Sequence, residues 1–207
     1  MIPQFNEAIV SYLFLALVFM TSVAGFFHRS FYYANVFQPG QVFAGKRPWT
    51  LVTSAFIHGG WLHLLFNIGV CVFFMTEVEY MLVDDFGFPV ASGALCFLVV
   101  GTVSFCNLME GVRLRKQPAA SAVGLSGFAF AMTVFFYIYF PLDTSPGMPW
   151  MKAYHFAFAI PAGCAVAWLM KLQTNHLVHL LGCAAGAITA VLIRPEIVSE
   201  LWNHFGG

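Results

Sequence analysis

The chain has 207 residues, of which 60% are hydrophobic and only 9% are charged, and its formal net charge is zero. Soluble domains carry roughly 25% charged residues, so a water-soluble fold could not bury this much apolar surface. The mean hydropathy of +0.80 therefore predicts a membrane protein whose main solvent is lipid. No basic excess suggests nucleic acid as a partner, and five irregularly spaced cysteines indicate free thiols.

Six apolar stretches predict an all-α, polytopic bundle in which residues 1–207 form a single transmembrane domain. Crossing about 30 Å of hydrocarbon takes about 20 helical residues, and the fourth and sixth stretches are shorter than that. The first stretch lacks the features of a cleaved signal, so we expect it to be retained. The expected spans are Ala8–Phe27, Leu62–Val83, Pro89–Leu108, Gly127–Phe140, Ala153–Met170 and Leu177–Ile193.

The connections between these spans carry clear break signals. Residues His28 to His58 form a long first connection that is rich in aromatic residues, as expected for a segment in the membrane interface. The stretch from Asp84 to Gly87 is predicted to turn between the second and third spans. Glu110 to Ser121 is predicted to be a charged loop before the fourth span.

Six spans place all even-numbered helices parallel to one another, which permits an estimate of depth. Ser126 lies fifteen residues before Pro141, and His179 lies fifteen residues before Arg194. At about 1.5 Å per residue, both residues would lie roughly 22 Å above the same membrane face. The serine and the histidine are thus predicted at matching depth inside the membrane, near one mouth.

Gly124-Leu125-Ser126-Gly127 opens the fourth span. Two glycines around one serine permit a tight turn, and the unpaired N–H groups of a helix start can stabilise an oxyanion. In the sixth span, His179, Gly182 and Gly186 share one helical face, and the two glycines let another helix approach closely. Such a contact would bring His179 to Ser126 as a general base, in a dyad because no acidic residue is near His179 in the sequence.

The segment from His58 to Asn67 contains a third constellation. His63 and Asn67 are one helical turn apart, and both can donate hydrogen bonds to a developing oxyanion. His58 precedes the helix and is expected to brace the local structure. Glu79 lies deeper in the same span, and we expect a structural role for it at the helix ends.

Other interpretations of these residues remain open at this point. Gly and Ser are common packing residues in membrane helices, and His or Asn side chains often form only interhelical hydrogen bonds. His176 and His179, with His58 and His63, could also bind zinc, although the chain has no H-E-x-x-H motif and few carboxylates. We expect no metal and no other cofactor.

In this order, the three motifs resemble the rhomboid family of intramembrane serine proteases. The matching stretches are residues 47–67, Gly124–Gly127 and His179–Gly186. The resemblance implies that Ser126 is the nucleophile and His179 its base, and that Gly124 and Gly127 flank the site. It also implies an oxyanion hole made of His63, Asn67 and the Ser126 N–H, with His58, Glu79, Gly182 and Gly186 as structural residues.

The resemblance further implies membrane-anchored protein substrates that are cut near the end of their transmembrane segment, in a bacterial inner membrane, with the mouth facing outward. The lysines and arginines of the loops point the other way, because they gather on the mouth side and the positive-inside rule would place that side in the cytoplasm. The alternative function is that of an inactive rhomboid-like protein, which binds transmembrane helices without cutting them. The presence of both Ser126 and His179 favours the protease.

Overall fold

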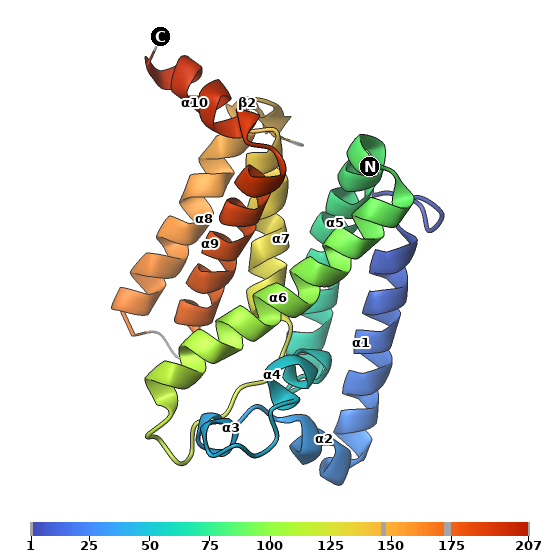
Figure 1. Cartoon of the computed structure of the whole chain (residues 1–207), viewed down its shortest axis with the longest axis vertical. Coiled ribbons are helices and arrows are strands. Elements are labelled where there is room, and N and C mark those ends of the chain that lie inside the picture. The colour runs from blue at the N-terminus through green and yellow to red at the C-terminus, as the bar shows by residue number, and fades with distance from the viewer. Residues whose placement is uncertain (1, 146–147, 172–174, 207) are drawn as a thin grey trace. The chain divides into compact units, whose positions relative to one another are not determined.

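The computed structural model describes residues 2–145, 148–171 and 175–206 (Figure 1). The chain divides into two compact units, residues 1–129 and residues 130–207. The division falls inside helix α7 (Ser126–Tyr139), so the first turn of this helix belongs to the first unit and the remainder to the second. Each unit is built mainly of helices, as the composition predicts.

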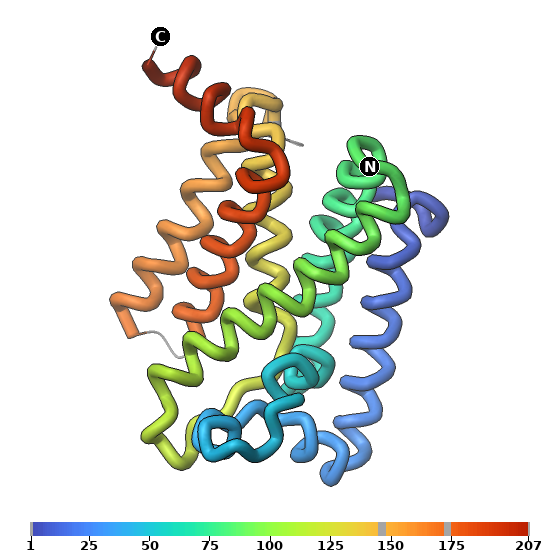
Figure 2. Tube along the Cα trace, in the orientation of Figure 1, coloured from blue at the N-terminus to red at the C-terminus, as the bar shows by residue number. Residues whose placement is uncertain are grey.

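In the first unit, three long helices lie side by side, with α1 packed along α5 and α5 along α6 (Figures 1 and 2). Short helices occupy the connection between α1 and α5. Phe14 of α1 contacts the rings of Phe56 and Phe128, at centroid distances of 5.4 and 6.2 Å. The helices are α1 (Ile9–Phe27), α2 (Arg29–Asn35), α3 (Pro39–Phe43), α4 (Thr50–Thr53), the 3-10 helix η1 (Ser54–Phe56), α5 (Trp61–Phe86) and α6 (Phe88–Leu114).

In the second unit, α8 packs closely against α9, and α7 approaches α9 through small residues. A buried cluster of Val134, Cys164 and Cys183 lies between these three helices. A short antiparallel hairpin, which the sequence did not indicate, connects α7 to α8. The elements that follow α7 are β1 (Thr144–Ser145), β2 (Met148–Lys152), α8 (Ala153–Leu169), α9 (His176–Ile193) and α10 (Glu196–Gly206).

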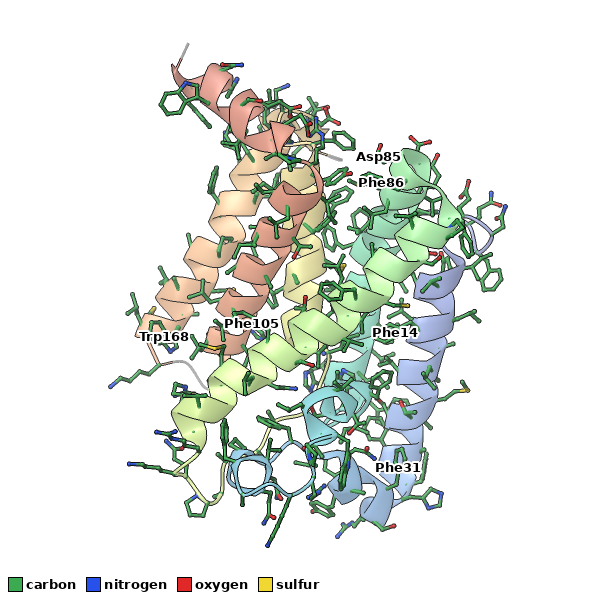
Figure 3. All side chains as sticks on the ribbon, viewed as in Figure 1. Phe14, Phe31, Asp85, Phe86, Phe105 and Trp168 are labelled. Carbon is green, nitrogen blue, oxygen red and sulfur yellow. The ribbon has the colours of Figure 1, made fainter. Side chains whose placement is uncertain are left out.

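Helices occupy all six predicted spans. Four of them, α1, α5, α6 and α9, are long and apolar enough to cross a membrane, whereas α7 and α8 are shorter apolar helices. The sixth span was expected to be short, and α9 has 18 residues, one more than predicted because it starts at His176. Exposed aromatic side chains lie along the helices of both units, among them Phe31, Phe105 and Trp168 (Figure 3). This exposure suits helices that have lipid as their solvent.

Two predicted connections were placed wrongly. Helix α5 continues through Asp84 and Asp85 to Phe86, and the chain turns only at Gly87, whose φ of 76° favours glycine. Helix α6 continues past Leu108 to Leu114, so the predicted loop from Glu110 starts too early. There Glu110 is buried and pairs with Arg113 one turn later, which satisfies the carboxylate within the helix. In the connection between α8 and α9, residues 172–174 lie outside the described residues.

Candidate active site

The segment that leads into Ser126 is held by the long first connection. Phe37 and Ala122 exchange two backbone hydrogen bonds of 3.1 and 2.9 Å, and the Gly124 N–H donates to the Ser54 carbonyl at 2.9 Å. Helix α6 supports this connection in turn, because the Asn107 amide donates to the Leu51 carbonyl and to Ser54 Oγ. The backbone before Ser126 is therefore fixed although it is not helical.

Gly124 allows His63 to lie directly against this backbone. Its φ is 107°, in the region that favours glycine. A Cβ atom at position 124 would be 2.5 Å from His63 Cε1 and 2.8 Å from Nε2. Any other residue would displace the imidazole or the turn. The structure thus brings together Gly124 and His63, two of the residues selected from the sequence.

His58 connects the same turn to α1. Its Nε2 accepts the Leu125 N–H at 3.3 Å, and its Nδ1 is 2.8 Å from Ser22 Oγ. Because the Ser22 hydroxyl donates to the Phe56 carbonyl, Nδ1 carries the proton and donates to Ser22. His58 is fully buried, and this burial, together with nearby His63, lowers its pKa to about 3. The imidazole is therefore neutral at physiological pH, in one defined tautomer.

Asn67 lies one turn after His63 on α5. Its side-chain amide donates to the His63 carbonyl at 2.9 Å, and the residue is 1% exposed. Among the described residues, its buried Oδ1 has no hydrogen-bond partner. Unpaired buried polar groups are costly, so such a group in a native fold points to a functional requirement or to an absent partner.

Glu79 lies three turns further along α5, where it is completely buried. Its carboxylate accepts the N–H groups of Val10 at 3.0 Å and Ser11 at 2.6 Å, in the first turn of α1. Those N–H groups have no partner inside the helix, and the positive end of the helix dipole favours an anion there. Ser11 Oγ also donates to the Met75 carbonyl, which adds a second tie between α1 and α5.

In the second unit, the His179 ring stacks on Phe130, with the centroids 4.4 Å apart and an angle of 19° between the planes. Phe130 follows Ser126 by one turn in the continuous helix α7. Phe130 was not among the residues that the sequence indicated, although its spacing of four from Ser126 places both residues on the same helical face. The His176 ring packs edge to face against the His179 ring, with the centroids 5.7 Å apart.

Beyond His179, α9 packs on α7 so closely that no side chain separates the two backbones at Gly186. A Cβ atom at Gly186 would lie 2.1 Å from the Ala131 carbonyl oxygen. Gly182 is also buried, one turn before Gly186, and Gly127 is buried in the first turn of α7. Small residues at such positions permit close helix approach where lipid surrounds the bundle.

The described contacts therefore join His58, His63 and Gly124 in the first unit. In the second unit they join His179 to Phe130, and Gly186 to Ala131. Ser126 belongs to the first unit, so its pairing with His179 stays a prediction. Within residues 2–145, 148–171 and 175–206, no three His, Cys, Asp or Glu side chains are grouped as metal ligands.

Comparison with known proteins shows the family to which the chain belongs. The model of the Rhomboid domain matches residues 45–196, which is more than half of the chain and includes His58, His63, Ser126 and His179. None of the curated proteins matches the sequence. The family match agrees with the four helices that can cross a membrane. The chain is therefore an integral membrane protein and belongs to the rhomboid family.

Proposed function

We propose that this protein is an intramembrane serine endopeptidase that cleaves the transmembrane segments of membrane-anchored proteins. The observation that carries the proposal is the stacking of His179 on Phe130, one turn after Ser126 in α7. Neighbouring turns of one helix face lie about 5–6 Å apart, and we propose that the imidazole on Phe130 reaches the preceding turn, which carries Ser126. The close approach of Gly186 to Ala131 supports the same pairing of helices.

In the proposed mechanism, the Ser126 hydroxyl attacks the carbonyl carbon of the scissile peptide bond while His179 takes up its proton. The negative charge then develops on the carbonyl oxygen, where His63, Asn67 and the Ser126 N–H would donate hydrogen bonds. His179 returns the proton to the leaving amine, which releases the first product. Water then attacks the acyl carbon while His179 takes up its proton. His179 passes this proton to the Ser126 oxygen as the second product leaves.

The hydrogen bond from Leu125 to His58 and the contact of Gly124 with His63 support the proposed oxyanion site. An oxyanion site is effective only if its donors are oriented before the reaction. The hydrogen bonds from Gly124 and Leu125 fix the backbone immediately before Ser126, and Gly124 sets the position of the His63 ring. We assign His58 as a positioning residue, because it holds the backbone and is not proposed to touch the substrate.

The substrates would be transmembrane helices that contain residues which weaken the helix. An intact helix in lipid satisfies its own backbone groups and hides its peptide bonds, so a segment must unwind locally before Ser126 can attack it. Small residues and helix-breaking residues at the cleavage site would lower the free energy of this step.

The experiment is cleavage of a reporter transmembrane segment by the purified full-length protein in lipid vesicles. We expect cleavage with the natural sequence and with Ser104→Ala or His28→Ala, which change residues outside the proposed machinery. We expect none with Ser126→Ala or His179→Ala. A protein that binds the reporter but never cuts it would support the alternative of an inactive rhomboid-like binding protein.

A further inference from the structure

Helix α10 follows the membrane-crossing helix α9 after only Arg194 and Pro195, and it lies almost wholly beyond the residues that match the Rhomboid domain. Its apolar side chains recur at the spacing of one helical face, and polar side chains fill the other face. The apolar face consists of Ile197, Val198, Leu201, Trp202 and Phe205, and the polar face of Glu196, Ser199, Glu200 and Asn203.

Only part of this apolar face packs against the protein. Ile197 is fully buried, whereas Val198, Trp202 and Phe205 are 58%, 75% and 63% exposed. Between α10 and the ends of α7 and α9 lies a groove of about 410 Å³, whose walls include Ile138 and Val191 opposite the apolar face of α10. All its walls are apolar side chains apart from Gly206, so water is a poor occupant.

The groove is held open by contacts on its polar side. Arg194 donates to the Tyr139 carbonyl at the end of α7 and to the carboxylate of Glu200 on α10. At the other end of α10, Phe205 meets the ring of Tyr154 edge to face, at 5.1 Å. Helix α10 is therefore fixed at two points, and the groove between them is part of the folded unit.

One wall of the groove belongs to the exposed face of α9, because Val191 lines the groove and lies one turn after Ile188. Ile188 and Leu192 lie on one face of α9 and are 60% and 74% exposed, as expected for side chains that contact lipid. Val198 and Trp202 continue this apolar surface on α10. Tryptophan is enriched at the level of the lipid headgroups, which fits the position of Trp202 just beyond the end of a span.

We propose that the groove between α10 and the ends of α7 and α9 binds an acyl chain of a bilayer phospholipid. The single cation at the start of α10, Arg194, is paired with Glu200, and Glu196 adds a further negative charge. Among the described residues, α10 carries no lysine or arginine, and its one basic residue, His204, lies in the last turn against the Tyr154 ring, so we expect the apolar chain to provide the binding. Affinity will depend little on headgroup charge or on salt.

The test measures quenching of tryptophan fluorescence by phosphatidylcholine with brominated acyl chains, using the full-length protein in vesicles. The chain has five tryptophans, so the signal of Trp202 is taken as the difference between the natural protein and Trp202→Phe. We expect strong quenching of this difference signal by bromines on upper acyl carbons, unchanged when anionic brominated lipid replaces the zwitterionic one. A difference signal that bromine does not quench would overturn the proposal.

A second measurement counts phospholipids that stay bound when the protein is released from detergent in native mass spectrometry. Val198→Asn makes the groove polar at an exposed position, and Ser199→Asn on the opposite face is its matched control. We expect Val198→Asn to lose one retained phospholipid and Ser199→Asn to keep it. Equal retention in both variants, or a natural protein that is dimeric through α10 without bound lipid, would contradict the proposal.

Discussion

The two units hold their candidate catalytic residues in different ways. In the first unit, buried side chains hydrogen bond to backbone groups: Glu79 to the start of α1, Asn107 to the connection before α5, and His58 to the turn before Ser126. In the second unit, His179 rests on an aromatic ring and α9 rests on α7 through glycine. One region thus relies on polar contacts and the other on close apolar packing.

The difference follows from the local backbone. The residues immediately before Ser126 in the first unit are not helical, so their N–H and carbonyl groups need partners, and lipid supplies none. The second unit consists mainly of helices that satisfy their own backbone groups, so it needs only surfaces that fit. Substitutions should therefore damage the first unit by removing a hydrogen-bond partner and the second by adding bulk.

The largest effect on stability is expected from adding a single methyl group to the second unit. Gly186→Ala places a Cβ atom against the Ala131 carbonyl, and because this Cβ is fixed to the α9 backbone and the carbonyl belongs to the α7 backbone, the helices must separate. We expect a loss of about 3 kcal/mol or more in the free energy of unfolding. Gly163→Ala is the matched control, since a Cβ atom there meets nothing within 4 Å. Equal melting temperatures for the two variants would show that the close approach is not needed.

The first unit should be sensitive to a substitution that removes a buried hydrogen-bond acceptor without adding bulk. Glu79→Gln keeps the shape of the side chain but leaves one acceptor oxygen for two N–H groups of α1. We expect a loss of about 2–3 kcal/mol in the free energy of unfolding. Asp84→Asn changes an exposed carboxylate on the same helix and should alter stability by less than about 0.5 kcal/mol. Similar unfolding curves for the two variants would contradict the role of Glu79 as the N-terminal cap of α1.

Acid should weaken the first unit through His58. Its pKa is about 3 in the folded protein and 6.5 in the unfolded chain, so between these values only the unfolded state binds the proton. The stabilisation is complete above pH 6.5 and declines as the pH falls toward 3, by about 1.4 kcal/mol per pH unit. We expect His58→Gln to lower stability at pH 7.5 and to flatten its decline between pH 6.5 and 5. An unchanged slope would place the acid sensitivity elsewhere.

The smallest effect on stability is expected at the ring beneath His179. Phe130→Leu removes the stacked surface and should cost about 1 kcal/mol in stability. Because the imidazole would then sample other orientations, kcat should fall by about tenfold. Phe156→Leu, which removes a similar stacked pair with Tyr137, should cost as much stability and leave kcat unchanged. Equal kcat values for the two variants would argue against a positioning role for Phe130.

The sequence predicted the parts of the fold that depend on hydropathy and spacing. Helices occupy the six apolar runs, and the order of three motifs pointed to the family that the Rhomboid domain match shows. Helix ends were less predictable: the charged residues Asp84 and Glu110 suggested loops, but the helices continue through both. Charge near a helix end is compatible with helix when a partner or solvent is available, and composition alone does not reveal that partner.

The sequence was least informative where contacts join distant segments. Nothing in the pattern around Glu79 indicated that it accepts N–H groups of α1, some seventy residues earlier in the chain. The tautomer of His58 also depends on Ser22 and Leu125, which only the fold brings together. Helix α10 could have been found, because its apolar spacing is regular, but it is too short to stand out as a span.

The central claim is that His179 activates Ser126, and the most direct measurement is covalent labelling by a fluorophosphonate that reacts only with activated serines. We expect labelling of the full-length protein in lipid at Ser126 alone, lost in His179→Ala and retained in His28→Ala, which changes an exposed histidine. Labelling of Ser126 at the same rate without His179, or no labelling of the natural protein under conditions in which it is folded, would contradict the account.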